Sequence, residues 1–177
     1  LKPNDVVTVE YAATVTKDAV IAGTGNPNET HLSYTDSTNV NKNTTTTETR
    51  TYVWEIDVFK YTKKEDVEAP LAGAEFILYR KTADGTAEYA QADVDNKITG
   101  WTQSKDDATK FVTPANGKFK ITGLDSGTYF LEETAAPAGY NMLKDPIEVV
   151  ITAAVDETTK TGTATITYNK AYTGEIK

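Results

Sequence analysis

A chain of 177 residues is long enough for one complete domain and part of a second. Its formal net charge of −8 opposes binding to nucleic-acid phosphates, and the lack of cysteine excludes disulfides and thiolate metal sites. We also expect no membrane insertion in this segment, because no apolar run reaches the roughly 18 residues of a spanning helix.

The N-terminal part predicts two strands. Residues 5–16 alternate between apolar and polar side chains, which is the period of a half-buried strand, and residues 31–35 are typical of a second strand. Two or three strands are too few for an independent sandwich, so we interpret residues 1–35 as the C-terminal part of a preceding β-sandwich domain. Residues 36–50 are rich in Thr and Asn and lack periodicity, and we interpret them as a linker.

Seven strand-like runs follow residue 50, separated by turn residues such as Asn116-Gly117. They are TYVWEIDVFKY, AEFILYR, KITGWTQ, GKFKITGL, GTYFLEET, PIEVVIT and GTATITYNK. Short β-rich runs with turns at this spacing predict an all-β, Ig-like sandwich, which we assign to residues 51–170. Residues 171–177 are expected to be a linker or the start of the next segment.

The first of these runs places a lysine on an apolar face. Lys60 continues the face of Trp54 and Val58 at the two-residue period of a strand. Burial favours the neutral amine, which is the nucleophilic form of lysine. A lysine at a strand end can equally extend to solvent, and alternation alone does not decide between the two.

Two further candidates lie in later runs. Glu133 shares a face with Tyr129 and Leu131, where burial favours the protonated acid, whereas Glu132 faces solvent. Asn169 lies at the end of the last run. The two-residue period of a strand puts it on the same face as Thr165 and Thr167, so a bulge or a threonine-lined inner face would be needed to turn it inward. A strand-end asparagine is also a common turn former.

Four segments together carry a family resemblance: WEIDVFKY, PLAGAEFILYRK, GKFKITGLDSGTYFLEETAAPAGY and TITYNK. They resemble the Cna-protein B-type (CnaB) domain of Gram-positive surface proteins and sortase-assembled pilins, over the whole of residues 51–170. The combination of LAGAEF with Y-x-L-x-E-T-x-A-P-x-G-Y is specific. The N-terminal segment, with GNPNETHLSYTDSTN, is similar to the end of a D2-type pilin domain.

The resemblance implies a covalent crosslink. In such domains the lysine of the first strand and the asparagine of the last are joined through their side chains, with the glutamate of the box promoting the reaction. By motif position these residues are Lys60, Asn169 and Glu133. Asn28 falls where the D2-type module has its bonding asparagine, whose lysine partner would lie upstream; an ordinary turn asparagine is the alternative.

The implied function is structural. The resemblance indicates a segment of a pilus subunit or adhesin stalk, extracellular and anchored to the cell wall, that joins other pilin subunits through sortase-linked polymerisation. We expect no cofactor, no metal and no enzymatic activity other than self-crosslinking. One alternative is an adhesive module that binds host extracellular matrix, cell surface or glycan through residues 84–113, including Trp101. A glycosidase, which needs two carboxylates, is a more distant alternative, and His31 is the single histidine available for catalysis.

Overall fold

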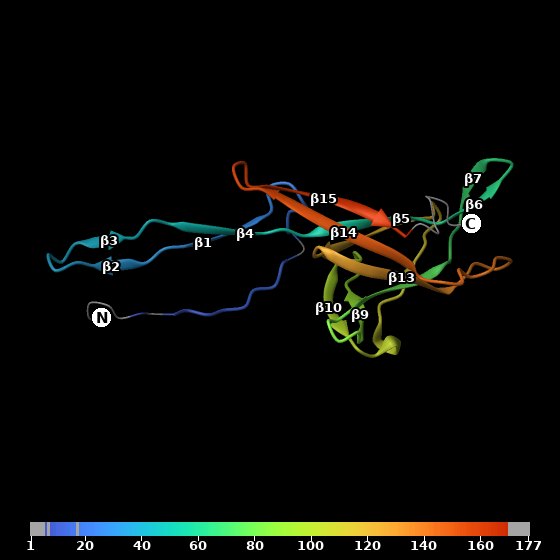
Figure 1. Ribbon diagram of the computed structural model, residues 1–177, viewed down its shortest axis with the longest axis horizontal. Helices are drawn as coiled ribbons and strands as arrows, with labels where there is room; N and C mark the ends of the chain where they lie inside the picture. The colour runs from blue at the N-terminus through green and yellow to red at the C-terminus, as the bar shows by residue number, and fades with distance from the viewer. Residues whose placement is uncertain (1–5, 7, 17, 170–177) are drawn as a thin grey trace.

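The computed structural model describes residues 6, 8–16 and 18–169, and the chain is almost entirely β. A β-sandwich forms the body, a narrow ribbon extends from one end of it, and a short hairpin projects near the other end (Figure 1). Within the described part of the chain, no helix is long and apolar enough to cross a membrane. The predicted all-β fold is therefore confirmed.

The larger sheet of the sandwich has the strand order β10-β9-β8-β13-β14-β15, and β11 also pairs with β8. All neighbouring strands in it are antiparallel. The bounds are Glu75–Lys81 for β8, Ala87–Ala92 for β9, Ile98–Thr102 for β10, Phe111–Val112 for β11, Gly127–Ala135 for β13, Ile147–Asp156 for β14 and Thr161–Tyr168 for β15. A 3₁₀ turn, η1, covers Lys105–Asp107.

The second layer is an antiparallel pair, β5 (Trp54–Phe59) and β12 (Lys118–Leu124). Their inward side chains pack against those of β8, β13 and β14 to form one apolar core. The core members from β5 and β12 are Trp54, Ile56, Val58, Phe119, Ile121 and Leu124. Alternation on β5 therefore predicted the buried face correctly, because one side of this strand faces the core and the other faces water.

The ribbon beside the sandwich is a long, two-stranded hairpin. In it β1 (Asn26–Thr30) pairs with β4 (Thr47–Thr51), and β2 (Ser33–Thr35) pairs with β3 (Asn41–Asn43) (Figure 1). The structure thus differs from the linker expected at residues 36–50, because β3 and β4 lie there. Threonine and asparagine leave no apolar alternation in this ribbon, whose strands are mostly exposed, so periodicity gave no signal.

The strand predicted over residues 5–16 is also corrected in its described part. Residues 8–16 join no ladder, and Val9 and Tyr11 are 78% and 63% exposed. Alternation indicates a strand only where a partner strand and a buried face exist, and no described strand supplies them here. The division into domains remains a prediction.

The base of the ribbon is joined to the sandwich by several contacts. The Ala22 amide donates to the Val53 carbonyl at 2.9 Å, and the Gly162 amide donates to the Gly23 carbonyl at 2.7 Å. Lys97, 8% exposed, donates from Nζ to the Val15 carbonyl at 3.0 Å and also to the Thr16 carbonyl. These bonds tie residues 15–16 and 22–23 to the end of the sandwich where β5 and β15 begin.

Candidate functional site

Lys60 lies immediately after β5 and points into the sandwich, which decides between the two orientations that alternation left open. It is 2% exposed, and it continues the inward face of Ile56 and Val58. Its backbone is fixed on both sides, because its amide donates to the Gly117 carbonyl at 2.8 Å and its carbonyl accepts from the Leu71 amide at 3.0 Å. The lysine therefore does not extend to solvent, and its side chain enters a buried environment.

Glu133 meets this lysine from the opposite layer. It lies on β13, on the buried face with Tyr129 and Leu131, and is 4% exposed. Its Oε1 is 2.9 Å from Lys60 Nζ, and its Oε2 accepts a 2.7 Å hydrogen bond from the Leu143 amide. The predicted inward orientation of Glu133 is confirmed, and the structure brings it together with Lys60.

The neighbouring side chains on β13 lie on the faces that strand alternation predicts. Glu132, on the other face, pairs with Lys105 at 2.8 Å, and this hydrogen bond raises the pKa of Lys105. Tyr129 donates from its hydroxyl to the Asp125 carbonyl at 3.0 Å. Burial raises the pKa of Tyr129 to about 12, so the phenol is neutral under ordinary conditions.

Asn169 lies one residue beyond β15 and is partly buried. Its amide still donates to the Glu148 carbonyl at 2.9 Å, which extends the pairing with β14. Neither a bulge nor a threonine-lined inner face orients it, because the β14–β15 register is continuous and Ala164 and Ile166 pack on the core. Instead β15 ends at Tyr168, so the alternation of side chains along the strand does not determine the direction of the Asn169 side chain. Its Oδ1 is buried.

The course of β15 leads Asn169 toward the Lys60 end of β5. A Cβ built on Gly162, near the start of β15, would lie 3.1 Å from the Trp54 ring. Tyr168, at the end of β15, donates from its hydroxyl to the Asp57 carbonyl at 3.5 Å. Both strands therefore advance in the same direction, and Asn169 follows Tyr168 as Lys60 follows β5.

The site has unsatisfied polar atoms. Among the described residues, the buried side-chain oxygens without a hydrogen-bond partner are Glu133 Oε1 and Asn169 Oδ1. Glu133 Oε1 is nevertheless in an ion pair with Lys60 Nζ at 2.9 Å, so within the described part of the chain Asn169 Oδ1 is the one of these two oxygens without a partner of either kind. A buried polar atom without a partner costs about 1–3 kcal/mol, and a buried ion pair is weak evidence for stability. Such a costly cluster is typical of a functional site.

Two contributors to the site were not predicted. Leu143, whose amide holds Glu133, lies in the irregular segment between β13 and β14, where no pattern marks a backbone donor. Gly117, which accepts from the Lys60 amide, was recognised only as part of an Asn-Gly turn. A Cβ there would lie 2.3 Å from the Lys60 carbonyl oxygen, so the turn sequence also sets the position of Lys60.

Asn28 lies on the exposed ribbon, away from this cluster. On β1 it pairs with Thr49, and its Oδ1 accepts a 2.7 Å hydrogen bond from the Tyr11 hydroxyl. These bonds occupy the side chain within the described residues. A crosslink from Asn28 to an upstream lysine stays a prediction.

His31 and Trp101 are the residues singled out for the alternative functions. His31 is exposed. Trp101, expected on a recognition surface, is partly buried against the core, stacks on Tyr129 and has the Arg80 guanidinium 4.2 Å above its ring. Residues 84–113 contain β9, β10, η1 and β11.

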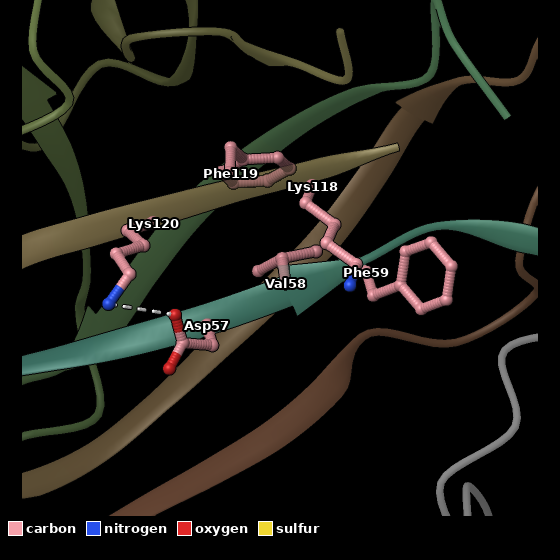
Figure 2. A pocket seen from close by; sticks show the side chains of 6 residues that line it. All are labelled: Asp57, Val58, Phe59, Lys118, Phe119 and Lys120. Carbon is pink, nitrogen blue, oxygen red and sulfur yellow. Dashed lines mark ion pairs between the residues drawn. The ribbon is translucent and has the colours of Figure 1, made fainter. Parts of the chain in front are cut away.

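A shallow pocket lies on the β5–β12 pair, near the site but separate in its lining (Figure 2). It is lined by Asp57, Val58, Phe59, Lys118, Phe119 and Lys120. Lys120 pairs with Asp57 at 3.3 Å, and Lys118 Nζ lies 4.7 Å from the centre of the Phe59 ring. Its charged groups thus contact other residues of the lining, and neither Lys60 nor Glu133 lines it.

Comparison with known proteins identifies the sandwich as a pilin-type domain. The family model for SpaA, a prealbumin-like fold domain, matches residues 57–169. Because this match covers more than half of the chain, the chain belongs to that family. A search of curated proteins finds no significant match.

Solved pilin structures are similar to the chain. The SpaE basal pilin from Lactobacillus rhamnosus GG, in its orthorhombic form, is 28% identical with a TM-score of 0.50, covering 65% of this chain and 38% of that one. The group B streptococcus pilus 2b backbone protein is 30% identical with a TM-score of 0.48, covering 63% and 39%. The full-length major pilin RrgB from Streptococcus pneumoniae is 22% identical with a TM-score of 0.43, covering 62% and 27%. The matches thus span well under half of each pilin.

Proposed function

We propose that this chain is a structural segment of a bacterial surface pilus or adhesin stalk, stabilised by an isopeptide bond between Lys60 and Asn169 that Glu133 promotes. The observation that carries the proposal is the buried Lys60–Glu133 pair at 2.9 Å, together with the unsatisfied Oδ1 of Asn169. Membership of the SpaA family supports the structural role. Sortase-linked polymerisation with other pilin subunits and anchoring to the cell wall belong to the same proposal.

The chemistry is a single intramolecular acyl transfer. One proton moves from Lys60 Nζ to Glu133 Oε1, which turns a buried ion pair into an amine and a neutral acid. The amine attacks Cγ of Asn169, the acid protonates Oδ1, and a tetrahedral intermediate forms. Proton transfer from the new C–N nitrogen to Nδ2, through Glu133, releases ammonia. As the carbonyl re-forms, the proton on Oδ1 returns to Glu133 and a neutral Lys–Asn amide remains. No oxidant or cofactor is consumed.

The fold supplies the rate by holding these groups together. Effective molarities of oriented intramolecular pairs reach roughly 10⁵–10⁸ M, so a weak nucleophile and a weak electrophile can react without an external catalyst. The reaction is self-modification with one turnover, and it does not make the chain an enzyme.

The bond would carry load between the first and last strands of the sandwich. It forbids extension of the chain between Lys60 and Asn169, which could otherwise reach roughly 360 Å at 3.3 Å per residue. By analogy with a disulfide that closes a loop of similar length, it would add about 4–5 kcal/mol through restriction of the unfolded chain. Unlike a disulfide, it resists reductants, which suits a cysteine-free protein outside the cell.

Intact-mass spectrometry of the purified, folded chain tests the proposal. We expect the mass to fall short of the sequence mass by one ammonia, and the deficit to disappear in Lys60→Ala and Glu133→Ala. The matched control is Glu132→Ala, which removes the adjacent carboxylate on the opposite face and should retain the deficit. Full sequence mass in the unmodified chain would refute the crosslink.

A further inference from the structure

The two carboxylate oxygens of Glu133 have different surroundings. Oε2 accepts a 2.7 Å hydrogen bond from the Leu143 amide, whereas Oε1 is 2.9 Å from Lys60 Nζ and has no hydrogen bond within the described residues. Both oxygens belong to a side chain with none of its area exposed. The protein therefore distinguishes between two oxygens that are chemically equivalent in a free carboxylate.

A backbone amide can only donate, so its partner oxygen must act as an acceptor. When Glu133 is protonated, its carbonyl oxygen is a better acceptor than its hydroxyl oxygen, so a proton on Oε2 would weaken the bond from the Leu143 N–H. The proton is thus directed to Oε1, the oxygen next to Lys60. We propose that the Leu143 amide is a positioning group that holds the transferable proton of Glu133 on Oε1, an inference that rests on the proposed crosslink.

This assignment removes an ambiguity from the reaction. With Oε2 held by Leu143, the proton that leaves Lys60 Nζ arrives on Oε1, and Oε1 then delivers it to Asn169 Oδ1. The same oxygen accepts the next proton from Nζ and passes it to the departing Nδ2 as ammonia forms. Every transfer uses one oxygen, so the carboxyl group does not need to rotate between steps.

Packing places the Leu143 amide at the site. Leu143 lies between β13 and β14 and is partly buried against the core, so its apolar side chain anchors an otherwise irregular segment. A turn in which the Tyr140 amide donates to the Pro137 carbonyl at 3.0 Å precedes it. The side chain and the amide of Leu143 thus have separable roles, anchoring and proton placement.

The test replaces the amide of Leu143 with an ester, which removes the N–H but keeps the side chain. The full chain is assembled by chemical ligation under denaturing conditions, so that it starts without a crosslink, and is then refolded while ammonia loss is followed by intact mass. We expect the ester chain to react about three- to tenfold more slowly than the all-amide chain, the effect of one hydrogen bond. An ester at the neighbouring Met142 controls for the chemical change and should react at the all-amide rate.

A comparison of the two changes at Leu143 separates proton placement from structural support. The ester removes the N–H and keeps the anchor, whereas Leu143→Ala keeps the N–H and trims the anchor. When the rates are compared at matched free energy of unfolding, only the ester should slow ammonia loss. An unchanged rate in the Leu143 ester would overturn the inference, as would an equal loss of rate in Leu143→Ala. If the all-amide chain itself lost no ammonia, the proposed crosslink would fail first, which is a distinguishable result.

Discussion

Gly117 offers a quantitative probe of how the fold positions Lys60. Its φ is +68°, and a Cβ there would lie 2.3 Å from the Lys60 carbonyl oxygen. In Gly117→Ala the left-handed backbone costs roughly 1–2 kcal/mol, and displacement of the Lys60 backbone adds about 1–3 kcal/mol as overpacking does in cores. We therefore expect a loss of about 2–5 kcal/mol in the free energy of unfolding.

The measurement is equilibrium urea unfolding followed by tryptophan fluorescence, in an Asn169→Ala background that cannot crosslink. Gly85→Ala is the matched control, because Gly85 has φ +88° but nothing within 4 Å of an added Cβ. The difference between the two variants isolates the contact with Lys60. In the crosslinking background, Gly117→Ala should also slow ammonia loss. Equal destabilisation by the two alanines would refute the reasoning.

Two further predictions concern buried polar groups. Because burial raises the pKa of Tyr129 to about 12, the folded chain keeps a proton that an unfolded tyrosine loses near pH 10, and stability should fall between pH 10 and 12. In urea unfolding at a series of pH values, the free energy of unfolding of Tyr129→Phe should fall by about 1–2 kcal/mol less than that of the unsubstituted chain over this range. The same pH dependence in both proteins would contradict this. Lys97→Met removes donors to the Val15 and Thr16 carbonyls, so amide hydrogen exchange over residues 18–25 should become faster. The free energy of local opening that exchange reports should fall by up to roughly 1.5–3 kcal/mol. Unchanged exchange would show that Lys97 does not hold this segment.

The sequence predicted the strands of the sandwich that have one face toward solvent and one face toward the core. On β13 the period of two assigned Glu133 to the core side, and Glu133 is buried there. For Lys60, which follows β5, the same period left the core and solvent both open, and the structure shows the side chain buried. Burial of this kind depends on local alternation, which a single sequence carries. All seven runs expected after residue 50 contain strands of the sandwich.

The remainder depends on long-range contacts or on backbone chemistry. The hairpin of β6 (Tyr61–Lys64) and β7 (Val67–Pro70) was missed because its β7 side chains are exposed and show no apolar alternation. The orientation of Asn169 follows from the end of β15 at Tyr168, and the alternation of residue types does not predict where a strand ends. Leu143 acts through its N–H, and every residue other than proline has one, so its type carried no signal.

Peptide mapping can detect the proposed covalent bond between the first and last strands of the sandwich. The folded chain is digested and the fragments are sequenced by tandem mass spectrometry. We expect one branched fragment in which Lys60 Nζ is bonded to Asn169 Cγ, with one ammonia lost. Two separate linear fragments, carrying an unmodified Lys60 and an unmodified Asn169, would contradict it.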